Sequence, residues 1–319
     1  NSDWTDTPSP LLNSPDKVAK LPADVIPTLE SHMTITDTTE GRHLVANPYF
    51  HIVDTQGNQL PYISEQDEVY KNDNELRILA LVNAEADYKS QSLQLSSAPM
   101  LLEGQEKGDY TIYLKPEITL SNVSLNVTHQ DLDKRKVFGD LRFRKAMSVA
   151  INRQEINEVA LFGQGTPKQY TGFSPMPDFI DKKWESYMIQ YDPEAANSLL
   201  DAIGMKDIDG DGMRELPNGE QLILNMQFAT QGVAGELVEL AGQQWGEVGI
   251  QSTVKEVTPD EYRSSQSSNN LDVGSWRKSQ PMAIVLGNNE LWVPPFENYF
   301  GHRNGMLWAE YLDTNGASG

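Results

Sequence analysis

The feature that most constrains the fold is a run of alternating helix and strand signals between Asp140 and Val273. Asp140 is placed to cap one helix, and Asn152 is placed to cap a second, with Glu155 as its capping-box partner. Further patterns predict helices at residues 192–203, 236–248 and 259–268, and strands at residues 221–229, 250–257 and 271–273. Strands that alternate with helices of this length favour an α/β domain with parallel strand pairs.

Outside this region the signals are weaker. Residues 1–20 are rich in polar residues and proline and predict a loop. A turn at residues 54–58 between two short apolar runs predicts a hairpin, residues 74–84 predict a helix, and residues 110–114 alternate like a strand. Trp245 falls on the predicted helix at 236–248, and we assign it to packing.

Composition excludes several kinds of partner and chemistry. The net charge of -21 repels phosphates and anionic lipid headgroups, so we expect neither nucleic-acid binding nor direct membrane binding. The absence of cysteine excludes disulfides, thiolate zinc ligands and a thiol nucleophile. The sequence has no apolar run long enough to span a membrane, and no phosphate-binding glycine loop, HExxH pair or GxSxG elbow.

Four segments carry a resemblance to a known family. They are NPYF at 47–50 with VDTQGNQLPYI at 53–63, FGDLRFRKAMSVAINR at 138–153, GQGTP at 163–167, and DPEAA at 192–196. Their residues, order and spacing resemble motifs of the extracellular solute-binding proteins of family 5, the peptide, nickel and oligosaccharide receptors of ABC importers.

The resemblance implies an α/β, two-lobed periplasmic-binding-protein fold of the type II kind, with a ligand enclosed between the lobes. The chain is expected to cross between lobes near residues 120–126 and to return near residues 272–276. We therefore expect residues 1–124 to form part of lobe I, 125–272 to form lobe II, and 273–319 to be the return segment. Lobe II is expected to be complete and lobe I incomplete, because family members carry more sequence before the NPYF-like segment.

The same resemblance implies a function and a set of partners. We expect a monomeric extracytoplasmic receptor, periplasmic or extracellular and lipid-anchored in its full-length form, that binds an oligosaccharide or oligopeptide and delivers it to ABC permease subunits. We expect no catalysis. Two alternatives stay open: a glycoside hydrolase, which would also use carboxylates and aromatic residues, and a binding or signalling module without a transporter.

Candidate ligand-binding residues lie around the two expected crossings. Trp276 offers a flat face for stacking, and Arg277 offers a forked donor for hydroxyls or a carboxylate. Asn126 could contribute an amide, and Tyr170 and Phe173 could wall the pocket. The segment 276–281, WRKSQP, lacks the acidic residue with which peptide-binding members of the family often meet a peptide amino group, so peptide and saccharide ligands both stay open.

One acidic segment resembles the first half of a calcium loop. Asp207, Asp209 and Asp211 occupy positions one, three and five, and Gly212 occupies the turn position. Position twelve is Asn218 instead of glutamate, although Glu215 at position nine could supply a carboxylate. Apart from this possible structural calcium site, we expect no cofactor, and an acidic turn without a metal is the alternative.

Overall fold

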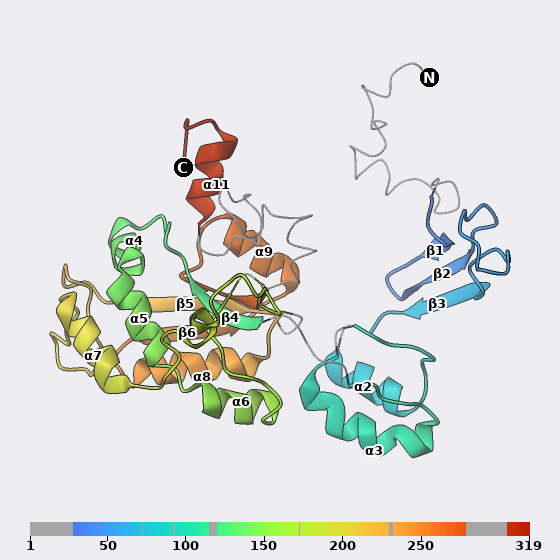
Figure 1. Ribbon diagram of the computed structural model, residues 1–319, viewed down its shortest axis with the longest axis horizontal. Helices are drawn as coiled ribbons and strands as arrows, with labels where there is room; N and C mark the ends of the chain where they lie inside the picture. Colours follow the sequence, from blue (N-terminus) through green and yellow to red (C-terminus); the bar gives the residue numbers. More distant parts are fainter. Residues whose placement is uncertain are drawn as a thin grey trace. The chain divides into compact units, whose positions relative to one another are not determined.

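The computed structural model describes residues 28–71, 73–91, 93–114, 120–171, 173–229, 232–278 and 305–319 (Figure 1). The chain divides into two compact units. Unit 1 consists of Asn1–Lys89 and Met100–Thr111, and unit 2 consists of Ser90–Pro99 and Ile112–Gly319. The loop expected at residues 1–20 lies outside the described residues. The lobe boundaries expected at 124–125 and 272–273 stay predictions.

Unit 1 contains an antiparallel sheet of three strands in the order β1-β2-β3. The turn expected at residues 54–58 is confirmed: the Asp54 amide donates to the Asn58 carbonyl at 2.9 Å, and Val53 and Gln59 form a single bridge. The expected helix at 74–84 is also confirmed as α2. The strands and helices are β1 (His32–Asp37), β2 (Gly41–Ala46), β3 (Glu65–Val69), α2 (Asn74–Val82) and α3 (Ala98–Gly108).

The strand expected at residues 110–114 is wrong, because this segment is irregular in the structure. Tyr110 instead folds back on the preceding helix α3, and its hydroxyl donates to the Leu101 carbonyl at 2.8 Å. A Cβ atom on Gly104 would lie 2.5 Å from the Tyr110 hydroxyl, and one on Gly108 would clash with the Tyr110 ring. The alternation of apolar residues therefore reflects a helix-end contact of Tyr110 and not a strand.

Unit 2 is built on a four-stranded sheet in the order β4-β7-β5-β6. Strands β5 and β6 pair in parallel, as do β5 and β7, while β4 pairs with β7 antiparallel. This arrangement confirms the expected α/β class with parallel pairs. The strand expected at 271–273 instead begins at Val273 and continues to Lys278. The strands are β4 (Leu120–Leu125), β5 (Ile223–Phe228), β6 (Gln251–Glu256) and β7 (Val273–Lys278).

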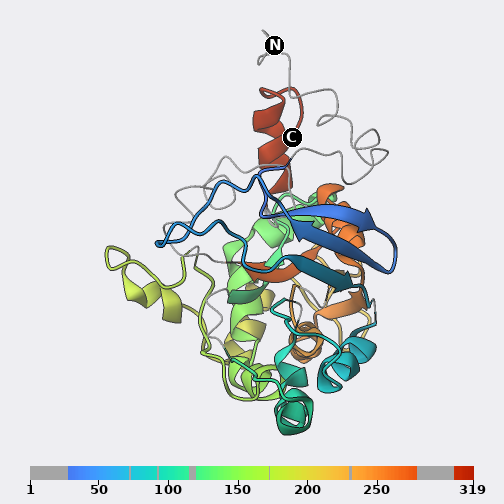
Figure 2. The same ribbon diagram turned by 90° about the vertical axis from the view of Figure 1, so that its right-hand side faces the viewer.

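Helices cover both faces of this sheet. In Figure 1, α6 and α8 lie on one side of the sheet and α9 lies on the other, and Figures 1 and 2 both show α11, in dark red, projecting away from it. The helices are α4 (Leu132–Gly139), α5 (Leu141–Val149), α6 (Arg153–Leu161), α7 (Pro193–Ala202), α8 (Gly235–Gly246), α9 (Pro259–Ser267) and α11 (Met306–Asp313), with short 3₁₀ turns η2 (Leu95–Ser97) and η3 (Lys182–Ser186).

The predicted helix caps are present. The side chains of Asp140, Asn152 and Asp192 accept from backbone amides in the first turns of α5, α6 and α7. At α6 the capping box is closed through a third residue: the Asn152 amide donates to Gln244 Oε1, and Gln244 Nε2 donates to Glu155, both at 2.8 Å. Because Gln244 belongs to α8, this cap also ties two helices together.

The main core of unit 2 lies between the sheet and helices α5, α6, α7 and α8. Trp245 is buried there, as expected, and its indole Nε1 donates to the Met147 carbonyl at 2.9 Å. A smaller cluster on the opposite face joins Val257, Tyr262 and Leu271, with Trp276 packed against it. The aromatic residue of greatest functional interest is therefore part of the smaller cluster.

Candidate ligand-binding site

Trp276 lies near the carboxyl end of β7, beside the turn that follows β5. Since β5 and β7 run parallel, both of these positions are at the carboxyl edge of the parallel strands. In open α/β sheets, ligands bind outside this edge. The fold therefore places Trp276 where a ligand would be expected.

Two neighbours hold the indole of Trp276. Its ring centroid is 5.0 Å from that of Tyr262 on α9, with the ring planes inclined by 37°. On the turn after β5, Gly232 approaches so closely that a Cβ atom there would lie 2.4 Å from the indole. Tyr262 is completely buried, whereas Trp276 keeps part of its surface exposed. Trp276 is thus a supported aromatic side chain that still reaches solvent.

Arg277 follows Trp276 in β7, and its backbone pairs with Ser121 of β4. The pairing shows that the two expected crossing segments are neighbouring strands of one sheet, since Asn122 lies opposite Trp276 in the same ladder. The role of Arg277 in binding stays a prediction.

Asn126 is buried at the other end of β4, beside the start of β7. Its amide nitrogen donates to Asn269 Oδ1 at 2.6 Å and to the Leu271 carbonyl at 3.0 Å. Its amide oxygen accepts from the Thr128 backbone amide at 3.2 Å. The structure therefore places Asn126 in a network that joins β4 to the approach of β7, and not beside Trp276. Its contribution to a ligand stays a prediction.

Tyr170 and Phe173 lie on the irregular segment between α6 and α7. Tyr170 is 39% exposed, and Phe173 is half-buried. The segment is anchored at its base, where Gln169 Nε2 donates to the Tyr187 carbonyl and Lys168 pairs with Glu185 at 2.7 Å. Their part in a binding pocket stays a prediction.

A partly buried arginine contacts the end of the same segment. Arg153 donates to the Ser148 carbonyl and to the Ser148 hydroxyl, both at 2.8 Å, and to the Ile189 carbonyl at 3.4 Å. Burial lowers the pKa of the Arg153 guanidinium to about 10, so it stays charged at neutral pH. Arg153, the last residue of the FRKAMSVAINR segment, therefore joins α5 to the end of the α6–α7 connection at Ile189.

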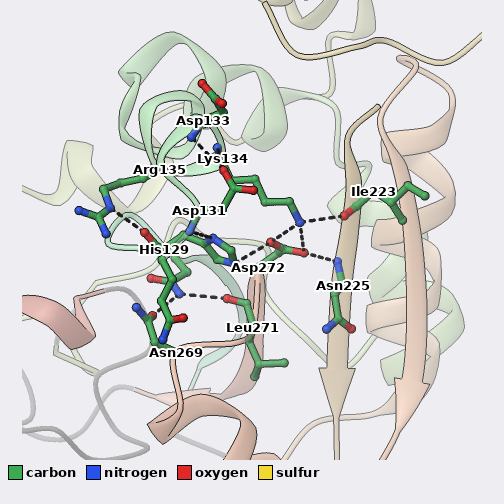
Figure 3. Close-up of polar contacts among 12 residues, drawn as sticks. His129, Asp131, Asp133, Lys134, Arg135, Ile223, Asn225, Asn269, Leu271 and Asp272 are labelled. Carbon is green, nitrogen blue, oxygen red and sulfur yellow. Dashed lines mark hydrogen bonds and ion pairs between the residues drawn. The ribbon is translucent and has the colours of Figure 1, made fainter. Parts of the chain in front are cut away.

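A buried ionic cluster surrounds Asp272, directly before β7, and was not predicted from the sequence (Figure 3). Asp272 is 1% exposed. Its carboxylate accepts from Lys134 at 2.9 and 3.0 Å and from the Asn225 amide at 2.7 Å, and it lies 3.2 Å from His129 Nε2. The one available signal was an acidic residue between two apolar ones, Leu271 and Val273. The cluster braces the amino ends of β5 and β7.

The tautomer of His129 follows from its two contacts. Nδ1 accepts from the Asp131 backbone amide at 3.0 Å, so the neutral ring carries its proton on Nε2 and donates to Asp272. Burial is the main cause that lowers the pKa of His129, and it outweighs the opposing attraction of Asp272. His129 is therefore a neutral donor in the folded protein at neutral pH.

The acidic loop is formed as the sequence suggests. Carboxylate oxygens of Asp207, Asp209 and Asp211 lie within 4.8 Å of one another, and all three residues are exposed. Asp207 also accepts from the Gly210 and Gly212 amides at 2.7 and 3.0 Å. Glu215, by contrast, is buried and accepts from the Ile208 amide at 2.7 Å. Glu215 therefore points at the backbone of the loop, and calcium binding stays a prediction.

No helix in the described part of the chain is long and apolar enough to cross a membrane.

The fold is that of the two-lobed periplasmic binding proteins. The periplasmic binding protein MelB of Agrobacterium fabrum, solved with stachyose, matches with a TM-score of 0.70 and 20% identity over 88% of this chain and 44% of its own. An oligopeptide-binding protein OppA matches with a TM-score of 0.56 and 30% identity over 95% of this chain and 50% of its own.

The family is shown by a sequence match over residues 35–283 to the bacterial extracellular solute-binding proteins, family 5. The chain belongs to this family. A periplasmic alpha-galactoside-binding protein of Rhizobium meliloti is 25% identical over 215 residues, covering 61% of this chain and 31% of the relative. A glutathione-binding protein GsiB of Pectobacterium atrosepticum is 28% identical over 183 residues, covering 57% of this chain and 30% of the relative. The chain thus spans less than a third of the length of these two relatives.

Proposed function

We propose that this protein acts as an extracytoplasmic solute-binding receptor of an ABC importer and binds an oligosaccharide or an oligopeptide at the carboxyl edge of the unit 2 sheet. The observation that carries the proposal is Trp276, a partly exposed indole supported by buried neighbours at that edge. Such a side chain suits stacking against a sugar ring or a peptide side chain. Arg277, Asn126, Tyr170 and Phe173 are the further residues proposed for the site.

The similar proteins support both ligand classes. The Rhizobium meliloti relative is named for alpha-galactosides, and MelB was solved with stachyose. The Pectobacterium atrosepticum relative is named for glutathione, and OppA is named for oligopeptides. Periplasmic relatives support a location outside the cytoplasm, and delivery of the solute to permease subunits is part of the same proposal.

The first experiment is a calorimetric titration of the protein with stachyose and, separately, with glutathione. We expect saturable binding of one probe. Replacing Trp276 with alanine should weaken that binding about 5- to 150-fold, equivalent to about 1–3 kcal/mol for a buried aromatic contact. Trp308→Ala is the control, because Trp308 is an exposed tryptophan on α11. Equal affinities of the Trp276→Ala variant and the wild type would argue against a site at Trp276.

The proposal includes an absence of catalysis. Stachyose or glutathione incubated with the protein should be recovered intact, as shown by chromatography of the mixture over several hours. Sustained release of galactose from stachyose would support the glycoside hydrolase alternative. Normal uptake of the bound solute by cells that lack the gene would support a binding module without a transporter.

We further propose that the loop of Asp207, Asp209 and Asp211 binds calcium in a structural role. Three carboxylates gathered on one turn favour a hard divalent cation. Calcium added to chelator-treated protein should then raise the melting temperature, and the Asp209→Asn variant should lose this effect. An unchanged melting temperature of the wild type would contradict the proposal.

A further inference from the structure

Gly232 is required by a neighbouring side chain and not by its own backbone conformation. It lies in the turn after β5, where its amide donates to the Ala229 carbonyl at 2.7 Å. Its φ angle lies outside the left-handed region that favours glycine. A left-handed φ therefore does not explain the glycine, and the explanation is sought in the groups that surround it.

That surrounding group is the indole of Trp276. A Cβ atom at position 232 would lie 2.4 Å from Cδ2 and from Cε3, and 2.7 Å from Cε2. Cδ2 is bonded to both of the other atoms inside the fused ring, so a point this near to all three must lie above the ring plane. The backbone of the turn at Gly232 therefore packs directly against one face of the indole.

The second neighbour of the indole is Tyr262, whose ring centroid is 5.0 Å away. Tyr262 is completely buried on α9, so it cannot move aside without disturbing the cluster it forms with Val257 and Leu271. The indole is thus packed between a backbone segment and a fully buried ring, and Trp276 still keeps part of its surface exposed.

We infer that Gly232 is a positioning residue for ligand binding: its missing side chain lets the turn after β5 support one face of Trp276, so that a ligand stacks only on the surface left uncovered by Gly232 and Tyr262. This inference rests on the proposed function. It makes the Trp276 platform one-sided, suited to a single sugar ring or a single flat side chain and not to a ligand that encloses the indole.

The test is a double-mutant cycle with Gly232→Ala and Trp276→Ala, measured first by thermal unfolding without any ligand. Gly232→Ala should lower the melting temperature when Trp276 is present, and should have little effect in the Trp276→Ala background, where the clash is absent. This comparison holds even if Gly232→Ala alone fails to fold, because the double variant should then regain a folded state. An equal loss in both backgrounds would overturn the inference.

Gly246→Ala is the matched control. Gly246 is in α8, and a Cβ atom there meets nothing within 4 Å. Alanine at this helix position should leave the melting temperature unchanged or raise it in both backgrounds. A loss as large as that of Gly232→Ala would contradict the inference, because Gly246 makes no contact with the indole.

Orientation and binding provide two further measurements. In protein labelled with 5-fluorotryptophan, the ¹⁹F resonance that disappears in Trp276→Ala belongs to Trp276, and Gly232→Ala should shift it while Gly246→Ala leaves it in place. Gly232→Ala should also weaken binding of stachyose or glutathione about tenfold, but only when Trp276 is present. Absence of wild-type binding to either probe would contradict the proposed function, whereas an unshifted ¹⁹F resonance would overturn the positioning role itself.

Discussion

Replacing Asp272 with asparagine tests the buried ionic cluster that braces the unit 2 sheet. Both carboxylate oxygens accept from donors: one from Lys134 and His129, and the other from Lys134 and the Asn225 amide. An asparagine side chain has the same shape but one NH₂ group. Whichever way that amide turns, its NH₂ meets a donor, and the Lys134 ammonium loses its countercharge.

The magnitude follows from burial. The Asp272 side chain is 2% exposed and that of Lys134 is 21% exposed, so water does little to screen the remaining charge. Loss of one partner from a buried pair typically costs about 3–5 kcal/mol of unfolding free energy. For a chain of this size, that loss corresponds to a fall in melting temperature on the order of 10 °C. Calorimetry or circular dichroism would measure it.

The same substitution at a surface ion pair serves as the control. Asp260 pairs with Arg263 one turn along α9 at 2.9 Å, with its side chain 93% exposed. Asp260→Asn should change the unfolding free energy by less than about 1 kcal/mol. If Asp272→Asn lowers stability no more than Asp260→Asn does, the cluster is not a brace and the argument from burial fails.

Three further predictions concern the described contacts. The pKa of His129 in the folded state is lowered from 6.5, so the unfolded chain binds the extra proton first as the pH falls. The free energy of unfolding should therefore decline below about pH 6.5 until the lowered pKa is reached. His129→Gln should flatten this dependence in melting curves recorded from pH 7 to 5. Gln244→Leu should lower the unfolding free energy by about 2 kcal/mol through its two hydrogen bonds, measured by urea unfolding, whereas the exposed neighbour Gln243→Leu should have little effect. Gly165→Ala should also lower the free energy of unfolding in the same assay, because its Cβ atom would lie 2.5 Å from Asn157 Oδ1. A decrease no larger than that of Gly246→Ala would contradict this prediction.

Local signals were the part of the fold that the sequence made predictable. Asp140, Asn152 and Asp192 cap their helices because a short polar side chain reaches amides only two or three residues away. The helical spacing of apolar residues around Trp245 likewise predicted correctly that Trp245 packs in the core. These features depend on neighbours in the chain, so one sequence is enough to recognise them.

Contacts between distant residues were not predictable in this way. Asp272 meets Lys134 from 138 positions away, and neither residue has a local pattern that points to the other. Gly232 has no sequence signature either, since its requirement comes from the indole of Trp276. The strand expected at residues 110–114 was wrong because alternation alone does not show whether a side chain such as Tyr110 faces a sheet or the helix before it.

Trp276 as a ligand-binding residue stays a prediction, and its surroundings were not predictable from the sequence. Resemblance to the family pointed to the return segment, and the structure places Trp276 at the carboxyl edge of the parallel strands. Asn126 was chosen from the opposite crossing, yet the antiparallel register of β4 and β7 puts Asn122, and not Asn126, opposite Trp276. The strand register decides which residue lies opposite Trp276, and it cannot be predicted from the sequence of either strand alone.

The strand order β4-β7-β5-β6 has a consequence for the order in which the sheet is assembled during synthesis. β7 is the last of these strands to leave the ribosome, yet it occupies a central place between the first strand, β4, and β5. Among the strands that the structure describes, β4 has no partner and β5 has only β6 until residue 278 has emerged. The nascent chain therefore holds β4 apart from the β5–β6 pair, and the strand bearing Trp276 joins them before the rest of unit 2, which ends at Gly319, has been synthesised.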